Sequence, residues 1–106
     1  MGKSTTQIMA ESNRIGVQFL LADLAVAQTF LNVAEVTQLA ATRTRNFRSA
    51  REAYETVLRL LPRLSPSEEE RDLLDAKIAE LRDRLFNAEI AERTKDEKDS
   101  KPENRI

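Results

Sequence analysis

The stretch from Val17 to Ala41 is the most hydrophobic part of the chain, and it constrains the fold more than any other. Read as a helix, it places one line of apolar side chains at steps of three and four, interrupted by Gln38. That line consists of Val17, Leu20, Leu24, Ala27, Leu31, Ala34 and Ala41. A second line beside it consists of Phe19, Val26, Phe30, Val33 and Ala40. Together they are wider than one partner helix covers, so the stretch predicts a helix with two neighbours.

The composition favours an all-α protein of one domain. A chain of 106 residues can bury one modest core. It has only two glycines and three prolines, which leaves little turn chemistry for a β fold. It has no cysteine and no histidine, so disulfides, thiolate or imidazole metal ligands and the most common proton shuttle are all missing. We therefore expect a protein that is not an enzyme, with no catalytic residue, cofactor or metal site.

The apolar spacing predicts a three-helix bundle over residues 14–93, with a long helix at about 14–43, a short helix at 46–61 and a long helix at 66–93. The short helix carries Phe47, Ala50, Tyr54, Val57 and Leu61 at heptad spacing and ends at Pro62. Ser65-Pro66-Ser67-Glu68 is typical of a capped helix start, with Ser65 at the cap. The third helix carries Leu74, Ile78, Leu81 and Leu85. Residues 1–13 are expected to form a partly ordered leader, and the charged residues 94–106 a disordered tail.

The unequal lengths of these helices predict an exposed apolar surface. A short second helix that runs antiparallel to the first cannot cover all of it, because each residue adds only about 1.5 Å. The uncovered part would expose Phe19, Leu20, Leu21 and Leu24. Exposed apolar patches usually mark an interface, so we expect self-association through these residues, with a homodimer as one outcome. The competing interpretation is that Ile8, Met9 and Ile15 fold back and cover the patch.

A cluster of arginines lies where the first two predicted helices meet. Arg43, Arg45, Arg48 and Arg51 occur with no acidic residue among them. Guanidinium groups gathered in this way can bind an acidic or phosphorylated partner. They can equally favour the dipole at the C-terminus of the first helix, or remain solvated. Nucleic-acid binding is not expected, because the net charge is −1 and only Phe47 lies nearby as a stacking aromatic.

Two families resemble parts of this pattern. Asn46-Phe47, Ala50, Tyr54, Val57-Leu58 and Pro62 resemble the second half of a tetratricopeptide repeat. Residues 17–92 as a whole are similar to microtubule-interacting-and-trafficking domains, on the basis of three helices with Ala50, Tyr54 and Val57-Leu58 in the second and Ile78 and Leu85 in the third. Both resemblances imply a helical module that recognises other proteins. The expected partner is therefore the protein itself or a helical segment of another protein.

No membrane association is expected from the sequence. Asp23, Gln28, Asn32 and Glu35 interrupt the most hydrophobic run, which falls short of the roughly 20 apolar residues that cross a bilayer. The first residues lack the apolar core and cleavage site of a signal peptide. These features predict a cytoplasmic location.

Overall fold

The computed structural model describes residue 2 and residues 4–100, with side chains as far as Arg93. Within this part of the chain there are three α-helices and no strand, which confirms the predicted all-α three-helix fold. The helices are α1 (Thr5–Val36), α2 (Ala40–Leu60) and α3 (Glu68–Ser100), and a short 3-10 helix, η1 (Leu61–Arg63), follows α2 directly. The second helix is therefore longer than the predicted 46–61. The bounds of the first and third helices also differ from the predicted 14–43 and 66–93.

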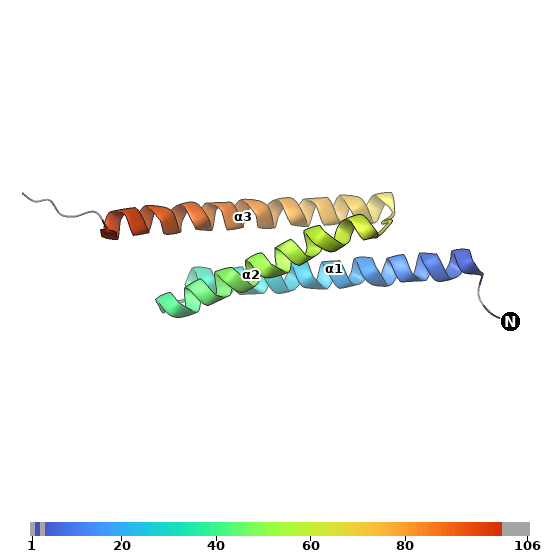
Figure 1. The fold of residues 1–106 in the computed structure, drawn as a ribbon, viewed down its shortest axis with the longest axis horizontal. Coiled ribbons are helices and arrows are strands. Elements are labelled where there is room, and N and C mark those ends of the chain that lie inside the picture. Colours follow the sequence, from blue (N-terminus) through green and yellow to red (C-terminus); the bar gives the residue numbers. More distant parts are fainter. Residues whose placement is uncertain (1, 3, 101–106) are drawn as a thin grey trace, which may run out of the picture.

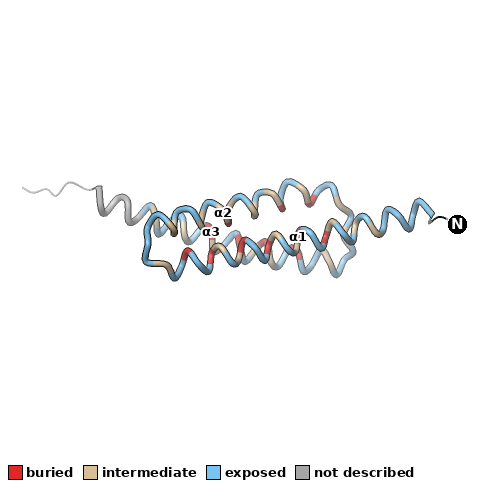
Figure 2. Tube along the Cα trace, turned by 90° about the horizontal axis from the view of Figure 1, so that it is seen from below, coloured by how far each residue is buried: buried red, intermediate tan, exposed pale blue. Residues whose placement is uncertain are grey.

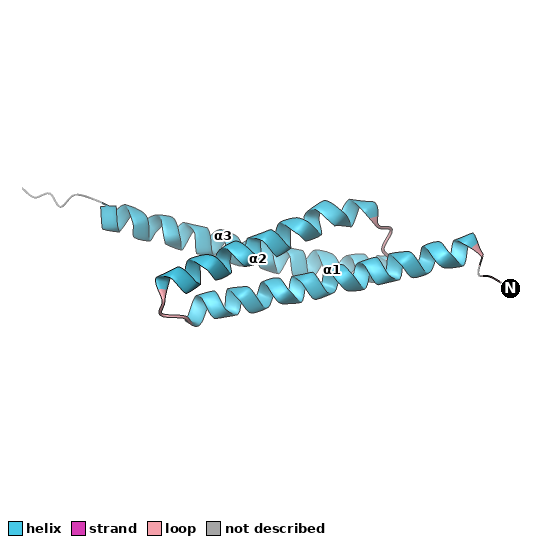
Figure 3. Ribbon diagram, turned by 60° about the horizontal axis from the view of Figure 1, so that its bottom comes forward, coloured by secondary structure: helices cyan, strands magenta, loops and turns pink. Residues whose placement is uncertain are grey.

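The three helices form an elongated bundle with a long axis of 81 Å. α1 and α2 form an antiparallel hairpin, and α3 turns back antiparallel to α2 and packs against both (Figure 1). α1 projects beyond the connection between α2 and α3 at one end, and α3 projects beyond the turn between α1 and α2 at the other (Figure 3). Each long helix therefore has one end with no neighbouring helix among the described residues.

The core lies along the inner faces of all three helices. In α1 it contains the first predicted line almost unchanged, because Val17, Leu20, Leu24, Ala27, Leu31 and Ala34 are buried. In α2 and η1 the buried residues are Ala50, Val57 and Leu61. In α3 they are Leu74, Ile78, Leu81 and Leu85. Tyr54 and Phe47 are half-buried and pack against this core. Ala41 is exposed because it belongs to α2 and not to the end of α1.

The structure corrects the prediction of a leader over residues 1–13, because α1 begins at Thr5. The hydroxyl of Ser4 accepts a hydrogen bond from the Gln7 amide, and the Gln7 side chain accepts one from the Ser4 amide. This capping box satisfies backbone donors that would otherwise lack partners and fixes the helix start. Ile8, Met9 and Ile15 continue this helix and are exposed, so they do not cover the bundle. The N-terminal end of α1 projects straight out of the bundle (Figure 2).

The turn between α1 and α2 was also predicted wrongly, since α1 ends at Val36 and not near residue 43. The Thr37 hydroxyl accepts a hydrogen bond from the Leu39 amide, which stabilises a bend without glycine or proline. The Arg43 guanidinium donates to the Thr37 carbonyl over 3.0 Å and satisfies an acceptor at the end of α1. The turn is therefore stabilised by the side chains of Thr37 and Arg43, without glycine or proline.

Side chains from α1 fix the connection between α2 and α3. The Ser65 amide donates to the Asn13 side chain over 2.8 Å. Leu64 lies against Gly16, where an added Cβ would come within 2.6 Å of a Leu64 methyl carbon. A second capping box then begins α3, because Ser67 and Glu70 exchange side-chain hydrogen bonds with each other's amides. The cap is therefore Ser67 and not the predicted Ser65.

The backbone of α3 continues to Ser100, beyond the predicted end near residue 93. Residues 101–106 lie outside the described residues, as do the side chains after Arg93. The disordered tail predicted for 94–106 therefore remains a prediction for its last part.

Candidate protein interaction site

The face of α1 that points away from the core is exposed and largely apolar. Its residues recur at steps of three, four and seven, so they form one continuous row along the helix. The row consists of Ile8, Ile15, Phe19, Ala22, Val26, Val33 and Val36, all of which are exposed. Phe19 is 54% exposed, Ile15 64% and Val36 79%. We call this row the outer face of α1.

The outer face is free of charge over most of its length. Between Arg14 and Glu35 the only charged residue of α1 is Asp23, which is half-buried and lies off the row. The residues beside the row are Gln18, Ala25 and Thr29, and the Thr29 hydroxyl donates to the Ala25 carbonyl within the helix. A solvated helix face normally carries charged side chains, so this composition is unusual for a surface that stays in water.

A shallow hollow lies beside the outer face at the level of Phe19. It lies between α1 and the end of α2, has a volume of about 570 Å³, and is lined mainly by Ile15, Gly16, Phe19, Leu60 and Leu64. The close approach of Leu64 to Gly16 brings the two elements together at its base. The hollow is open and mostly apolar, which suits an apolar side chain from another surface.

The residues predicted for self-association differ in their burial. Leu20 and Leu24 are each 1% exposed, so they belong to the core and cannot form an external surface. Leu21 is half-buried and packs against the core. Phe19 alone is exposed as predicted. The prediction failed because α2 is longer than 46–61, and with η1 it covers the inner face of α1 up to Gly16.

Most of the outer face was missed by sequence reasoning. It placed Val26 and Val33 in a second apolar line that a neighbouring helix would cover, and it placed Ile8 in a leader that could fold back together with Ile15. The signal for the correct assignment was present in the sequence. Ser4 and Gln7 have the spacing of a capping box, and this predicts a helix start at Thr5. A helix from that point places Ile8 and Ile15 in line with Phe19 and Val26.

The predicted arginine cluster does not form one site. Arg43 is half-buried and holds the end of α1, as described above. Arg51 forms an ion pair with Glu89 of α3. Arg45 and Arg48 are exposed. The four side chains therefore do not all lie together: Arg48 and Arg51 line the same cleft, whereas Arg43 lies at the end of α1. Arg43 and Arg51 also have structural contacts within the bundle.

A cleft between α2 and α3 brings part of the cluster beside residues of α3. It has a volume of about 440 Å³, with Phe47, Leu85 and Ala88 forming its apolar part. Its charged lining residues are Arg48, Arg51, Glu89, Glu92 and Arg93. Because three arginines and two glutamates line it, the cleft has no strong excess of either charge. It could accept a side chain with an apolar body and one anionic group.

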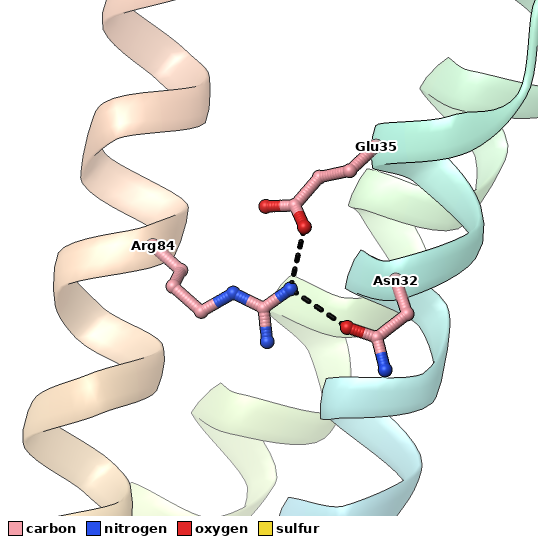
Figure 4. Close-up of polar contacts among 3 residues, drawn as sticks. All are labelled: Asn32, Glu35 and Arg84. Carbon is pink, nitrogen blue, oxygen red and sulfur yellow. Dashed lines mark hydrogen bonds and ion pairs between the residues drawn. The ribbon is translucent and has the colours of Figure 1, made fainter.

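Figure 4 shows the polar contact that fixes α3 against α1. One guanidinium nitrogen of Arg84 donates to the Asn32 amide oxygen over 2.9 Å and to a Glu35 carboxylate oxygen over 2.7 Å. The Arg84 side chain is 23% exposed, so solvent screens the ion pair only in part. Glu35 is therefore occupied on the side of α1 that faces α3, away from the outer face.

Within the described residues, no group of three acidic side chains is placed to hold a metal ion. α1 is long and apolar enough to cross a membrane by length and composition alone, although a third of its most apolar window is buried in the bundle. The core helix of a soluble protein passes the same test, so this is a weak indication.

Comparisons of the chain with protein-family profiles, with curated proteins and with solved structures gave no match.

Proposed function

We propose that this protein is a non-enzymatic interaction or assembly module and that the outer face of α1 is its docking surface. The observation that carries the proposal is the row of exposed apolar residues from Ile8 to Val36. Apolar surface on this scale is unfavourable in water, and monomeric proteins rarely keep it as a continuous patch. Its heptad-like spacing matches the way that one helix packs against another.

The helical class of the partner follows from the shape of this surface. A row along one helix, with a hollow at Phe19, fits an apolar helix that lies lengthwise along α1, in either chain direction. The resemblance to tetratricopeptide repeats and to microtubule-interacting-and-trafficking domains is in keeping with such a partner, because both resemblances imply a helical module that recognises other proteins. We also propose a cytoplasmic location, because polar residues interrupt the apolar run of α1 and the first residues lack the features of a signal peptide.

Sedimentation velocity over a range of protein concentrations tests the proposal. The change is Val26→Glu, which places a charge in the middle of the outer face without touching the core. The matched control is Ala76→Glu, at an exposed position of α3 outside the face. We expect Val26→Glu alone to weaken association. Equal sedimentation of both variants and the unmodified chain at all concentrations would contradict the proposal.

A second candidate function is regulatory binding of an acidic or phosphorylated partner in the cleft between α2 and α3. It is favoured by Arg48 and Arg93, which line that cleft together with Phe47. Binding of a phosphorylated peptide should then fall with added salt and with the double change Arg48→Ala and Arg93→Ala. Arg45→Ala is the control, since Arg45 lines none of the hollows described above.

A further inference from the structure

We propose that the cleft between α2 and α3 binds a free phosphate monoester with a short apolar body, and that its phosphate lies between Arg48 and Arg93. This inference rests on the second candidate function and names its ligand as a small molecule. The outer face of α1 plays no part in it. The apolar floor of the cleft, the ion pair that crosses it and the position of these two arginines carry the inference.

The floor of the cleft is apolar and has the size of a small-molecule site. It is formed by Phe47 of α2 together with Leu85 and Ala88 of α3, and the volume is about 440 Å³. Sites for small molecules usually have volumes of roughly 300–1,000 Å³ and mainly apolar linings. Phe47 is half-buried, so a ligand that covers the rest of its ring removes further apolar surface from water. The floor therefore suits a short alkyl chain or a single ring.

An ion pair crosses the cleft and favours a short ligand over a long one. Arg51 of α2 and Glu89 of α3 both line the cleft and pair with each other, so their side chains bridge it. Thr44 lines the cleft about two turns of α2 away from Arg51. At that end α3 continues past the turn between α1 and α2 (Figure 3). A peptide lying lengthwise between α2 and α3 would have to displace the bridge, whereas a short molecule that enters beside Thr44 leaves it intact.

The charges that line the cleft are unevenly placed. Glu89 is neutralised by its pair with Arg51. Glu92 also lines a second hollow, of about 270 Å³, which contains residues of α1, whereas no residue of α1 lines the first cleft. Arg48 and Arg93 line only the first cleft and are exposed, and no described residue forms an ion pair with either of them. The side of the cleft away from α1 therefore has an excess of positive charge.

Two arginines on opposite helices match a phosphate better than a carboxylate. Each planar guanidinium can donate two parallel hydrogen bonds to the oxygens of an anion. One guanidinium is enough to engage both oxygens of a carboxylate, whereas the phosphate of a monoester has three terminal oxygens and can accept from both arginines. The Thr44 hydroxyl offers a further donor in the same cleft. The apolar body of the ester then lies on Phe47.

A nuclear magnetic resonance titration of the full chain with octyl phosphate tests the inference, because shifts of individual amides locate the ligand. We expect shifts at the amides of Thr44 and Ala88, and none at Val26 on the outer face. Octanol has the apolar body without the charge, and inorganic phosphate has the charge without the body. Each should bind at least about tenfold more weakly than octyl phosphate, because each lacks one of the two contacts.

The double change Arg48→Ala and Arg93→Ala should weaken the binding of octyl phosphate by about tenfold or more. Both positions are exposed, so the bundle should keep its helix content, which circular dichroism measures. Arg45→Ala is the matched control and should leave the affinity unchanged, since Arg45 lines none of the hollows. Equal affinity of the unmodified chain and the double variant would overturn the inference. Shifts confined to the outer face, or equal affinity for octyl phosphate and octanol, would overturn it too.

Two further ligands separate the anion and its source. Octanoate that binds as tightly as octyl phosphate would overturn the assignment of a phosphate. If a peptide with phosphoserine beside leucine binds and octyl phosphate does not, and the double variant loses the peptide, the free ester is wrong and the second candidate function stands. If neither the peptide nor octyl phosphate binds, both fail.

Discussion

Single residues of α1 divide sharply by the face on which they lie. Leu24 is fully buried against the other helices, whereas Phe19 and Val26, on the outer face, are half-exposed. A large side chain stabilises the folded chain only to the extent that folding removes it from water. Buried and outer-face residues of the same helix should therefore affect two different properties, folding and association.

Leu24→Ala is expected to lower the free energy of unfolding by about 2–5 kcal/mol, because it removes buried methyl groups and leaves a cavity. Phe19→Ala should lower the same quantity by less than about 1 kcal/mol when measured on the monomer. Urea denaturation followed by circular dichroism at low protein concentration measures both. Similar losses in the two variants would show that the outer face is part of the core of the single chain.

The contact of Arg84 with Asn32 and Glu35 is a second feature at this scale. Arg84→Ala should cost about 0.5–1 kcal/mol of stability at low salt, because the pair is partly exposed at the Glu35 end. Arg71→Ala, which breaks an exposed pair with Asp75 within α3, is the control and should cost less. A cost for Arg84→Ala that does not decrease in added salt would argue against an electrostatic contribution.

Helix ends, at the scale of the elements, are the part of the fold that sequence reasoning located least well. The heptad spacing located the buried residues of all three helices, since burial follows the periodicity of the helix directly. The turn at Thr37 was missed because it depends on a hydroxyl and on Arg43, four residues into α2, and not on glycine or proline. That single error shortened α2, and the shortened helix led to the incorrect exposure of Leu20 and Leu24.

The two capping boxes should differ in their effect although their chemistry is the same. Ser67→Ala at the start of α3 should reduce global stability by about 1 kcal/mol, because α3 packs on the core within two turns of its cap. Ser4→Ala should loosen only the first turns of α1, which lie beyond the bundle in the single chain. Hydrogen exchange of the amides near Ile8 measures the local effect, and thermal denaturation measures the global one. A large fall in melting temperature for Ser4→Ala would contradict this distinction.

At the scale of the whole molecule, α1 has one side that the other helices cover and one side that the described residues leave uncovered. α3 and α2 cover the inner face, and α1 continues past the end of the bundle (Figure 1). The exposed apolar row extends along this part of the helix to Ile8. The sequence indicated that one neighbouring helix cannot cover the apolar side chains of α1, because they form an arc that is wider than one helix covers. The sequence could not show which residues remain exposed, because that depends on where α2 begins and ends.

The central claim is that another molecule covers the outer face of α1 in solution, and a tryptophan at position 19 measures this most directly. The chain has no tryptophan, so Phe19→Trp gives a single fluorescent probe on the face itself. If the claim is correct, its emission shifts to shorter wavelength as protein concentration rises, in step with the molar mass from light scattering. Emission typical of a solvent-exposed indole at every concentration, with the mass of a monomer, would contradict it.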